Sequence, residues 1–261
     1  MDTQTARELI ALNNRFYAEH AQSFSATRSA PWKGWARVLD TWREATDCSS
    51  LLDLACGNLR FEAFAARSLG ETAQPIPRFY CVDSCPQLAD APQEDLPPVR
   101  YQTLDMLDAL LAGRDLASAI EAPRCSLVAC FGFMHHIPRQ ETRRSFMRVL
   151  ASKAEPHGLI AISFWQFTDD ARLAAKAARS DEMASGEHPP FEGFARGPLD
   201  PGDHFLGWQQ DPRPLRYCHS FAEDEVDALV RSVADCAREV ERFSADGSSD
   251  TLNRYLILQR I

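Results

Sequence analysis

Short apolar runs alternate with amphipathic stretches along most of this chain. Helical spacing of apolar residues is clearest over residues 59–69 and 139–154. Five apolar runs have the length and composition of buried strands: residues 50–55, 78–82, 99–104, 125–131 and 159–165. Repeated alternation of strand and helix predicts a parallel sheet with right-handed crossovers.

The two ends of the chain extend this pattern. Helical spacing over 4–20 and 31–45 predicts two helices before the first strand. After residue 166 the pattern breaks, and a helix-like stretch at 169–184 leads into a Gly- and Pro-rich segment, which favours a functional cap over a linker. The remaining elements are a turn at 156–158, a helix at 221–234 and a closing pair of strands at 236–243 and 252–259.

These elements predict an α/β fold, with a doubly wound, mostly parallel, seven-stranded sheet in a single domain over residues 1–261. Four parts are expected: N-terminal helices over the site (1–46), a ligand-binding core (47–165), a cap (166–220), and a C-terminal helix with the closing strands (221–261).

Composition narrows the classes of function. The formal net charge of −9 disfavours a broad nucleic-acid coat, so any nucleic-acid contact must be local. Four arginines at 139, 143, 144 and 148 share about one helical face, which is either an RNA contact or, by default, a solvated surface. No apolar run approaches the ~18 residues of a membrane span and no secretory signal is visible, so we expect a cytoplasmic protein without membrane contact. The eight cysteines lack paired metal-site spacing, so we expect reduced, mostly buried thiols and no metal.

Chemically important residues follow the predicted strands. A doubly wound sheet binds its ligand at the carboxyl ends of its strands. The turn from Asp53 to Asn58 has small residues where the backbone must pass close to a ligand. Asp83 and Asp105 end the next two strands, where acids could accept hydrogen bonds from a ribose and from an adenine amino group. A dinucleotide-binding Rossmann domain is the alternative, but the glycine spacing does not match the pyrophosphate fingerprint.

The run LDLACGNLRF resembles the first motif of class I methyltransferases, Asp-x-Gly-x-Gly with a following glycine, but has Ala55 and Leu59 at two glycine positions. The resemblance implies S-adenosylmethionine (SAM) as cofactor, with the turn beside its methionine part, Asp53 near its amino group, Asp83 on the ribose hydroxyls and Asp105 beside adenine. The full set of cofactor-binding residues expected on this basis is Asp53, Ala55, Cys56, Gly57, Asn58, Asp83, Ser84, Asp105, Met106 and Phe131.

Three further segments narrow the resemblance: residues 24–32 (FSATRSAPW), 133–137 (FMHHI) and 216–221 (RYCHSF). Together with Gly-Asp-His at 202–204 and Asn-Arg-Tyr at 253–255, they are similar to the tRNA wobble-uridine carboxymethyl methyltransferases, which esterify a carboxymethyl group on the uridine. The resemblance implies that Arg28 clamps the carboxylate, Trp32 covers a base, His135 and Tyr217 orient the attacking oxygen and His219 is a further donor.

Two other functions stay open. A small-molecule O- or N-methyltransferase fits the acidic chain, and a phenol or amine acceptor would need a histidine as base, whereas a carboxylate is already ionised. A non-catalytic SAM-binding subunit is suggested by Leu59 and by eukaryotic relatives that work with a small partner protein. The expected partners are therefore a tRNA or a small-molecule acceptor, with a small activating protein as a further candidate.

Overall fold

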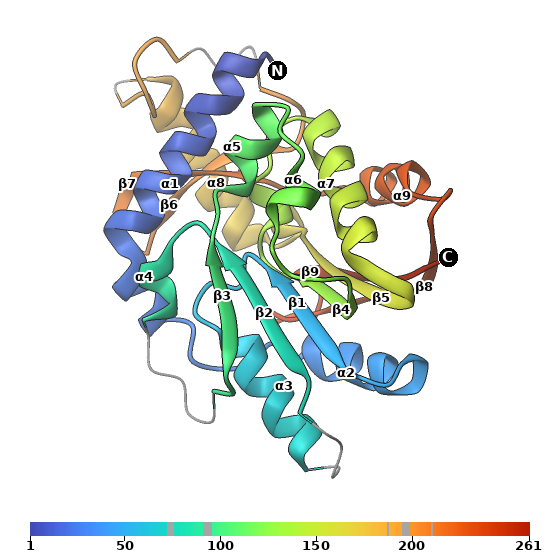
Figure 1. Cartoon of the computed structure of the whole chain (residues 1–261). Coiled ribbons are helices and arrows are strands. Elements are labelled where there is room, and N and C mark those ends of the chain that lie inside the picture. Colours follow the sequence, from blue (N-terminus) through green and yellow to red (C-terminus); the bar gives the residue numbers. More distant parts are fainter. Residues whose placement is uncertain (72–75, 91–95, 187, 195–198, 210) are drawn as a thin grey trace.

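A computed structural model describes residues 1–71, 76–90, 96–186, 188–194, 199–209 and 211–261. Seven of its strands form one sheet in the order β3-β2-β1-β4-β5-β9-β8 (Figure 1). The first five of that order are parallel, and β9 runs antiparallel to both of its neighbours. The seven strands are β1 (Ser50–Leu54), β2 (Arg78–Asp83), β3 (Val99–Thr103), β4 (Cys125–Cys130), β5 (Ala154–Trp165), β8 (Ala237–Ala245) and β9 (Asn253–Arg260). The predicted doubly wound, mostly parallel sheet is confirmed.

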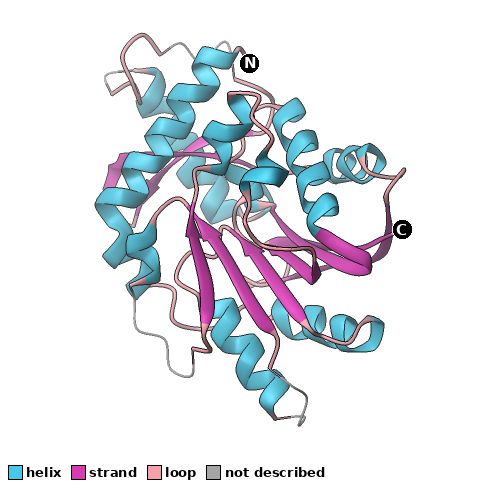
Figure 2. Ribbon diagram, in the orientation of Figure 1, coloured by secondary structure: helices cyan, strands magenta, loops and turns pink. Residues whose placement is uncertain are grey.

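Helices cover both faces of this sheet (Figure 2). Alternate residues of a strand point to opposite faces. Leu51 of β1 packs with helices α2 and α3, whereas Leu52 and Leu54 pack with α5, α6, α7 and α9. The described α-helices are α1 (Thr3–Ala26), α2 (Gly34–Ala45), α3 (Arg60–Gly70), α4 (Pro86–Ala89), α5 (Met106–Leu111), α6 (Leu116–Ala119), α7 (Gln140–Lys153), α8 (Ala171–Ser185) and α9 (Glu223–Ser232). No helix among them is both long enough and apolar enough to cross a membrane.

The predicted cap contains a feature that the pattern did not predict. Strands β6 (Asp203–Trp208) and β7 (Asp211–His219) pair antiparallel as a separate hairpin, and α1 packs against it through Leu9 and Leu12. Two prolines at 212 and 214 hide this strand from a sequence pattern, because proline lowers strand propensity. Residues 195–198 of the predicted Gly- and Pro-rich segment lie outside the described part of the chain.

Two element boundaries also differ from the prediction. Helix α1 continues to Ala26, six residues beyond its predicted end, and β5 begins at Ala154, across the predicted turn. Strand β4 pairs with β5 first at Ala154 and then, after an irregularity, from Leu159 onward. The predicted turn is therefore a bulge within one strand.

The predicted arginine face of α7 is wrong at Arg143. Its side chain is 2% exposed and donates to the Ile137 carbonyl at 2.9 Å and to Asp203 Oδ1 at 3.3 Å. Arg144 and Arg148 remain exposed, and Arg148 pairs with Asp235. All eight cysteines are free thiols and seven are buried, as predicted.

Candidate functional site

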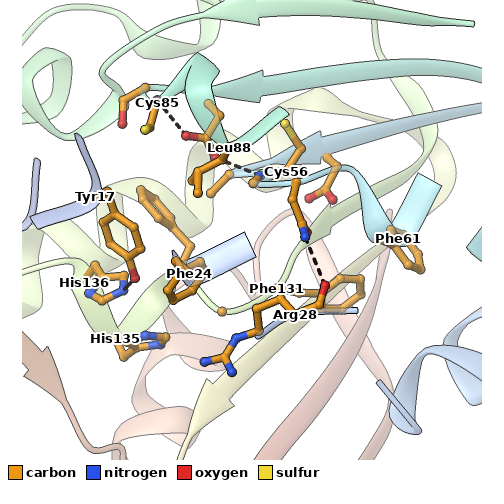
Figure 3. A pocket seen from close by; sticks show the side chains of 18 of the residues that line it. Tyr17, Phe24, Arg28, Cys56, Phe61, Cys85, Leu88, Phe131, His135 and His136 are labelled. Atoms are coloured by element: carbon orange, nitrogen blue, oxygen red, sulfur yellow. Dashed lines mark hydrogen bonds between the residues drawn. The ribbon is translucent and has the colours of Figure 1, made fainter. Parts of the chain in front are cut away.

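A cavity of about 300 Å³ opens at the carboxyl ends of β1, β2 and β4 (Figure 3). Its walls come from the strand-end turns, the segment between α1 and α2, and the turn between β8 and β9. All ten residues predicted to bind the cofactor line it: Asp53, Ala55, Cys56, Gly57, Asn58, Asp83, Ser84, Asp105, Met106 and Phe131. Of the five residues predicted to act on the acceptor, Arg28, Trp32 and His135 line it.

The turn after β1 alternates in backbone conformation. Ala55, Gly57 and Leu59 have φ angles of 70°, 55° and 61°, in the left-handed region that favours glycine. The first motif of class I methyltransferases has glycine at these three positions. This chain keeps the turn with Ala55 and Leu59 at two of them, each strained by about 1–2 kcal/mol. A Cβ added at Gly57 would meet no atom within 4 Å, which leaves its cavity side open for a ligand.

Asp83 is fixed at the end of β2 by two backbone donors. Its oxygens accept from the Gly57 N–H at 2.9 Å and from the Cys85 N–H at 2.8 Å (Figure 3). Burial raises the pKa of Asp83, although these backbone donors act in the opposite direction. A ligand that donates hydrogen bonds, such as a diol, would favour the ionised carboxylate here.

Both carboxylate oxygens of Asp105 already accept hydrogen bonds from the protein. One oxygen caps α5 by accepting from the Asp108 N–H at 2.9 Å, and the other accepts from Asn14 Nδ2 at 2.7 Å. An adenine amino group would therefore have to share Asp105 with these donors. Asn14 also lines the cavity, and no sequence pattern pointed to it.

The part of the cavity around Arg28 and Arg216, here called the arginine lobe, holds two guanidinium groups that form no ion pair with an acid among the described residues. Arg216 is 7% exposed, lies over the rings of Phe16, Trp165 and Trp208, and makes one long contact to Tyr17 Oη at 3.4 Å. Its Nε has no hydrogen-bond partner in the part of the chain that the structure describes. Arg28 lies over Phe24, and no ion pair joins either arginine to a described acid. Burial and the charge of Arg216 lower the pKa of Arg28.

The two adjacent histidines of this lobe have different surroundings. His135 packs against Trp165, with ring centroids 4.8 Å apart and ring planes tilted by 58°, and its buried Nδ1 has no hydrogen-bond partner among the described residues. Burial, with the charges of His136 and Arg216, places the pKa of His135 well below its usual range, so the ring is neutral near pH 7. His136 contacts the Tyr217 carbonyl at 3.1 Å and Tyr17 Oη at 2.8 Å, and burial lowers its pKa to about 3.

His135, His136 and Cys218 have donor atoms within 4.8 Å of one another, so we tested them as metal ligands. Both ring nitrogens of His136 already have partners, and burial raises the pKa of the Cys218 thiol to about 11. The nearby Arg216 cation would also repel a metal ion. The three residues therefore fit a metal poorly.

The structure corrects two of the predicted acceptor residues. Tyr217 and His219 do not line the cavity, and each is fully buried. Both contact Asp203 Oδ1, Tyr217 through its hydroxyl at 2.6 Å and His219 through Nδ1 at 2.7 Å. Arg216 precedes them on β7 and points to the cavity, so the two-residue period of the strand turns 217 and 219 to the other side. Their contacts join the β6–β7 hairpin to α7 through Arg143.

Side chains of the turn after β1 and of the start of α3 also hold the segment that carries Arg28 and Trp32. Asn58 Nδ2 donates to the Arg28 carbonyl at 3.0 Å (Figure 3), and Arg60 Nη1 donates to the Ala30 carbonyl at 2.6 Å. Trp32 lies so close to Gly132 that a Cβ there would be 3.1 Å from its ring. Arg60, Arg216 and Tyr17 line the cavity and were not predicted as site residues; strand alternation in RYCHSF could have indicated Arg216.

Comparison with known proteins identifies the fold. No family model and no curated protein sequence matches this chain. Its structure is similar to that of the 1,6-didemethyltoxoflavin-N1-methyltransferase from Burkholderia thailandensis, solved with S-adenosylhomocysteine: the TM-score is 0.57, identity is 15%, and the match covers 98% of this chain and 89% of that one. An amino pentose methyltransferase from Micromonospora echinaspora, solved with SAM, matches with a TM-score of 0.55 and 15% identity over 92% of this chain and 96% of that one. A SAM-dependent methyltransferase from Methanosarcina mazei matches with a TM-score of 0.55 and 11% identity over 84% and 96% of the two chains. This chain therefore has the Rossmann-like fold of the class I methyltransferases.

Proposed function

We propose that this protein is a SAM-dependent methyltransferase. The observation that carries the proposal is the cavity at the carboxyl ends of β1, β2 and β4, with its left-handed turn and its anchored Asp83. The residues fit SAM: the open side of Gly57 admits the methionine part, and Asp83 has the surroundings of a diol acceptor. When bound, SAM supplies a methyl group on a sulfonium centre, which an acceptor attacks in line.

The arginine lobe supports an anionic acceptor. Arg28 and Arg216 have no ion pair with a described acid, and guanidinium groups bind carboxylates through paired hydrogen bonds. A carboxylate is ionised at neutral pH and needs no base, whereas His135, with its depressed pKa, is a weak base. In this proposal the two arginines hold and orient the carboxylate, Trp32 covers the acceptor, and neutral His135 exchanges a hydrogen bond with it.

The finer proposal is a carboxymethyl group on a tRNA wobble uridine, which rests on the sequence resemblance. The second candidate is a small-molecule O- or N-methyltransferase. It is favoured by the acidic chain and by the small molecules in the names of two fold relatives, 1,6-didemethyltoxoflavin and an amino pentose. A SAM-binding subunit without turnover, active only with a small protein partner, is the third.

The test is calorimetric titration with SAM and with S-adenosylhomocysteine, then transfer of labelled methyl to bulk tRNA and to a metabolite extract. Label in tRNA that mild alkali releases as methanol indicates a methyl ester on RNA; label only in metabolites favours the second candidate. Arg28→Ala should abolish transfer but keep SAM binding, whereas the exposed Arg144→Ala should change neither. Normal SAM binding without transfer to any fraction indicates the third candidate, and absence of SAM binding refutes the proposal.

A further inference from the structure

Two carboxyl groups lie side by side beneath the first turn. Asp53, on β1, is 3% exposed and lines the cavity, and Glu62, in the first turn of α3, is fully buried. Strand register pairs Cys81 of β2 with Asp53, and the Cys81 thiol donates to Glu62 Oε1 at 3.3 Å, so the two carboxyl groups are neighbours. A hydrogen bond between them requires a proton on at least one. Asp53 Oδ1 and Glu62 Oε2 have no other hydrogen-bond partner in the described chain.

The groups around this pair do not neutralise it. Asp83 on β2 adds negative charge beside Asp53, and the Cys81 thiol donates to Glu62 Oε1 at 3.3 Å. The Cys130 thiol on β4 and the Cys56 thiol of the turn complete the titratable surroundings. Burial raises the pKa of Asp53 and of Glu62 well above their usual range. The Glu62 carboxyl raises the pKa of Asp53 further, whereas contact with Asp53 lowers the pKa of Glu62, as expected for two groups that share one proton. Two ionised carboxylates at this position would repel each other strongly.

We propose that Asp53 and Glu62 share a proton in the ligand-free chain and release it to solvent when the ammonium group of a bound ligand lies beside Asp53. The proposal rests on the proposed function, because the α-ammonium of SAM is the cation that the cavity would receive. Asp53 contacts the cavity and Glu62 does not, so Glu62 acts as a positioning residue that sets the charge of Asp53. The affinity for SAM should therefore increase as pH rises, whereas deprotonation of the ligand's own amine would decrease it.

Calorimetry in two buffers of different ionisation enthalpy, PIPES and Bis-Tris at about pH 6.5, measures the proton directly, because an α-amino group is fully protonated there. We expect about one proton released per SAM or S-adenosylhomocysteine bound, and a dissociation constant that falls by up to tenfold per pH unit as pH rises. Methylthioadenosine, which has no ammonium group, should release none. Equal binding heats for SAM in the two buffers would overturn the proposal.

Two variants assign the proton to the pair. Glu62→Gln places an amide beside Asp53, so SAM should still bind but release close to no proton, and its affinity should be nearly independent of pH. Glu71→Gln, on an exposed acid at the end of the same helix, should behave as the wild type. Undiminished release by a folded Glu62→Gln variant would exclude Glu62 as the partner. Wild-type calorimetry tests the proposal even if that variant does not fold, and a chain that binds no SAM would refute the proposed function itself.

Discussion

Replacement of Arg216 by methionine should stabilise the ligand-free protein while it weakens binding of an anionic acceptor. The guanidinium is buried, with one weak hydrogen bond to the described residues, and its desolvation costs several kcal/mol. Tyr17 and Cys218 would offset this charge only as anions, and burial raises the pKa of both. The three rings around Arg216 return about 1 kcal/mol each.

Burial of the Arg216 charge therefore lowers the stability of the ligand-free protein by about 1–3 kcal/mol. Methionine removes this cost because it has no charge and fills the space of the apolar arginine stem. For a chain of this size each kcal/mol raises the melting temperature by about 2–4 °C. Urea denaturation without polyvalent anions measures the change, and Arg148→Met is the matched control. Its pair with Asp235 is exposed and screened by solvent, so its loss should leave stability nearly unchanged.

The same variant should lose the response to anions. Added sulfate or acetate should stabilise the wild type by binding the folded state, and should stabilise Arg216→Met much less. With an anionic acceptor, loss of charge-assisted hydrogen bonds worth about 1.5–3 kcal/mol lowers kcat/KM roughly 10- to 150-fold. A variant destabilised by more than about 1 kcal/mol would show that Arg216 has a structural role and would refute the reasoning.

Three further predictions follow from single residues. Gly57→Ala should destabilise the chain by about 1–2 kcal/mol in urea denaturation, because its φ is +55° even though the space around it is open. The control, Gly70→Ala, lies in open space at the end of a helix and should be neutral or stabilising. Equal effects of the two substitutions would contradict the argument. Asp203→Asn should cost about 3–5 kcal/mol at pH 7, because a buried arginine and histidine lose their shared acid. Burial raises the pKa of Asp203, but its arginine and histidine partners outweigh burial and lower the pKa overall. The loss of stability caused by Asp203→Asn should therefore shrink as pH falls below about 4, where the wild-type carboxylate becomes protonated. A loss that stays constant with pH would refute this. Asp83→Asn should weaken SAM binding at least tenfold by calorimetry, whereas the exposed Asp90→Asn should not.

The acceptor side could not be read fully from the chain. The resemblance directed attention to Tyr217 and His219, but their side chains lie on the far side of β7 and hold a buried acid. Arg216, one residue earlier, faces the cavity. Which side of a strand faces a site depends on how the hairpin packs, and two prolines concealed that this hairpin exists.

The sheet and the strand-end residues of the cavity could be predicted from the chain alone. Strands buried on both faces are continuous apolar runs, and the carboxyl ends of parallel strands meet at one edge, so residues such as Asp53, Gly57 and Asp83 converge wherever the sheet forms. The position of Glu62 beside Asp53, and the lack of an ion pair between Arg216 and any described acid, are seen only in the folded chain. Both depend on distance and burial between different elements, and local periodicity carries no information about either.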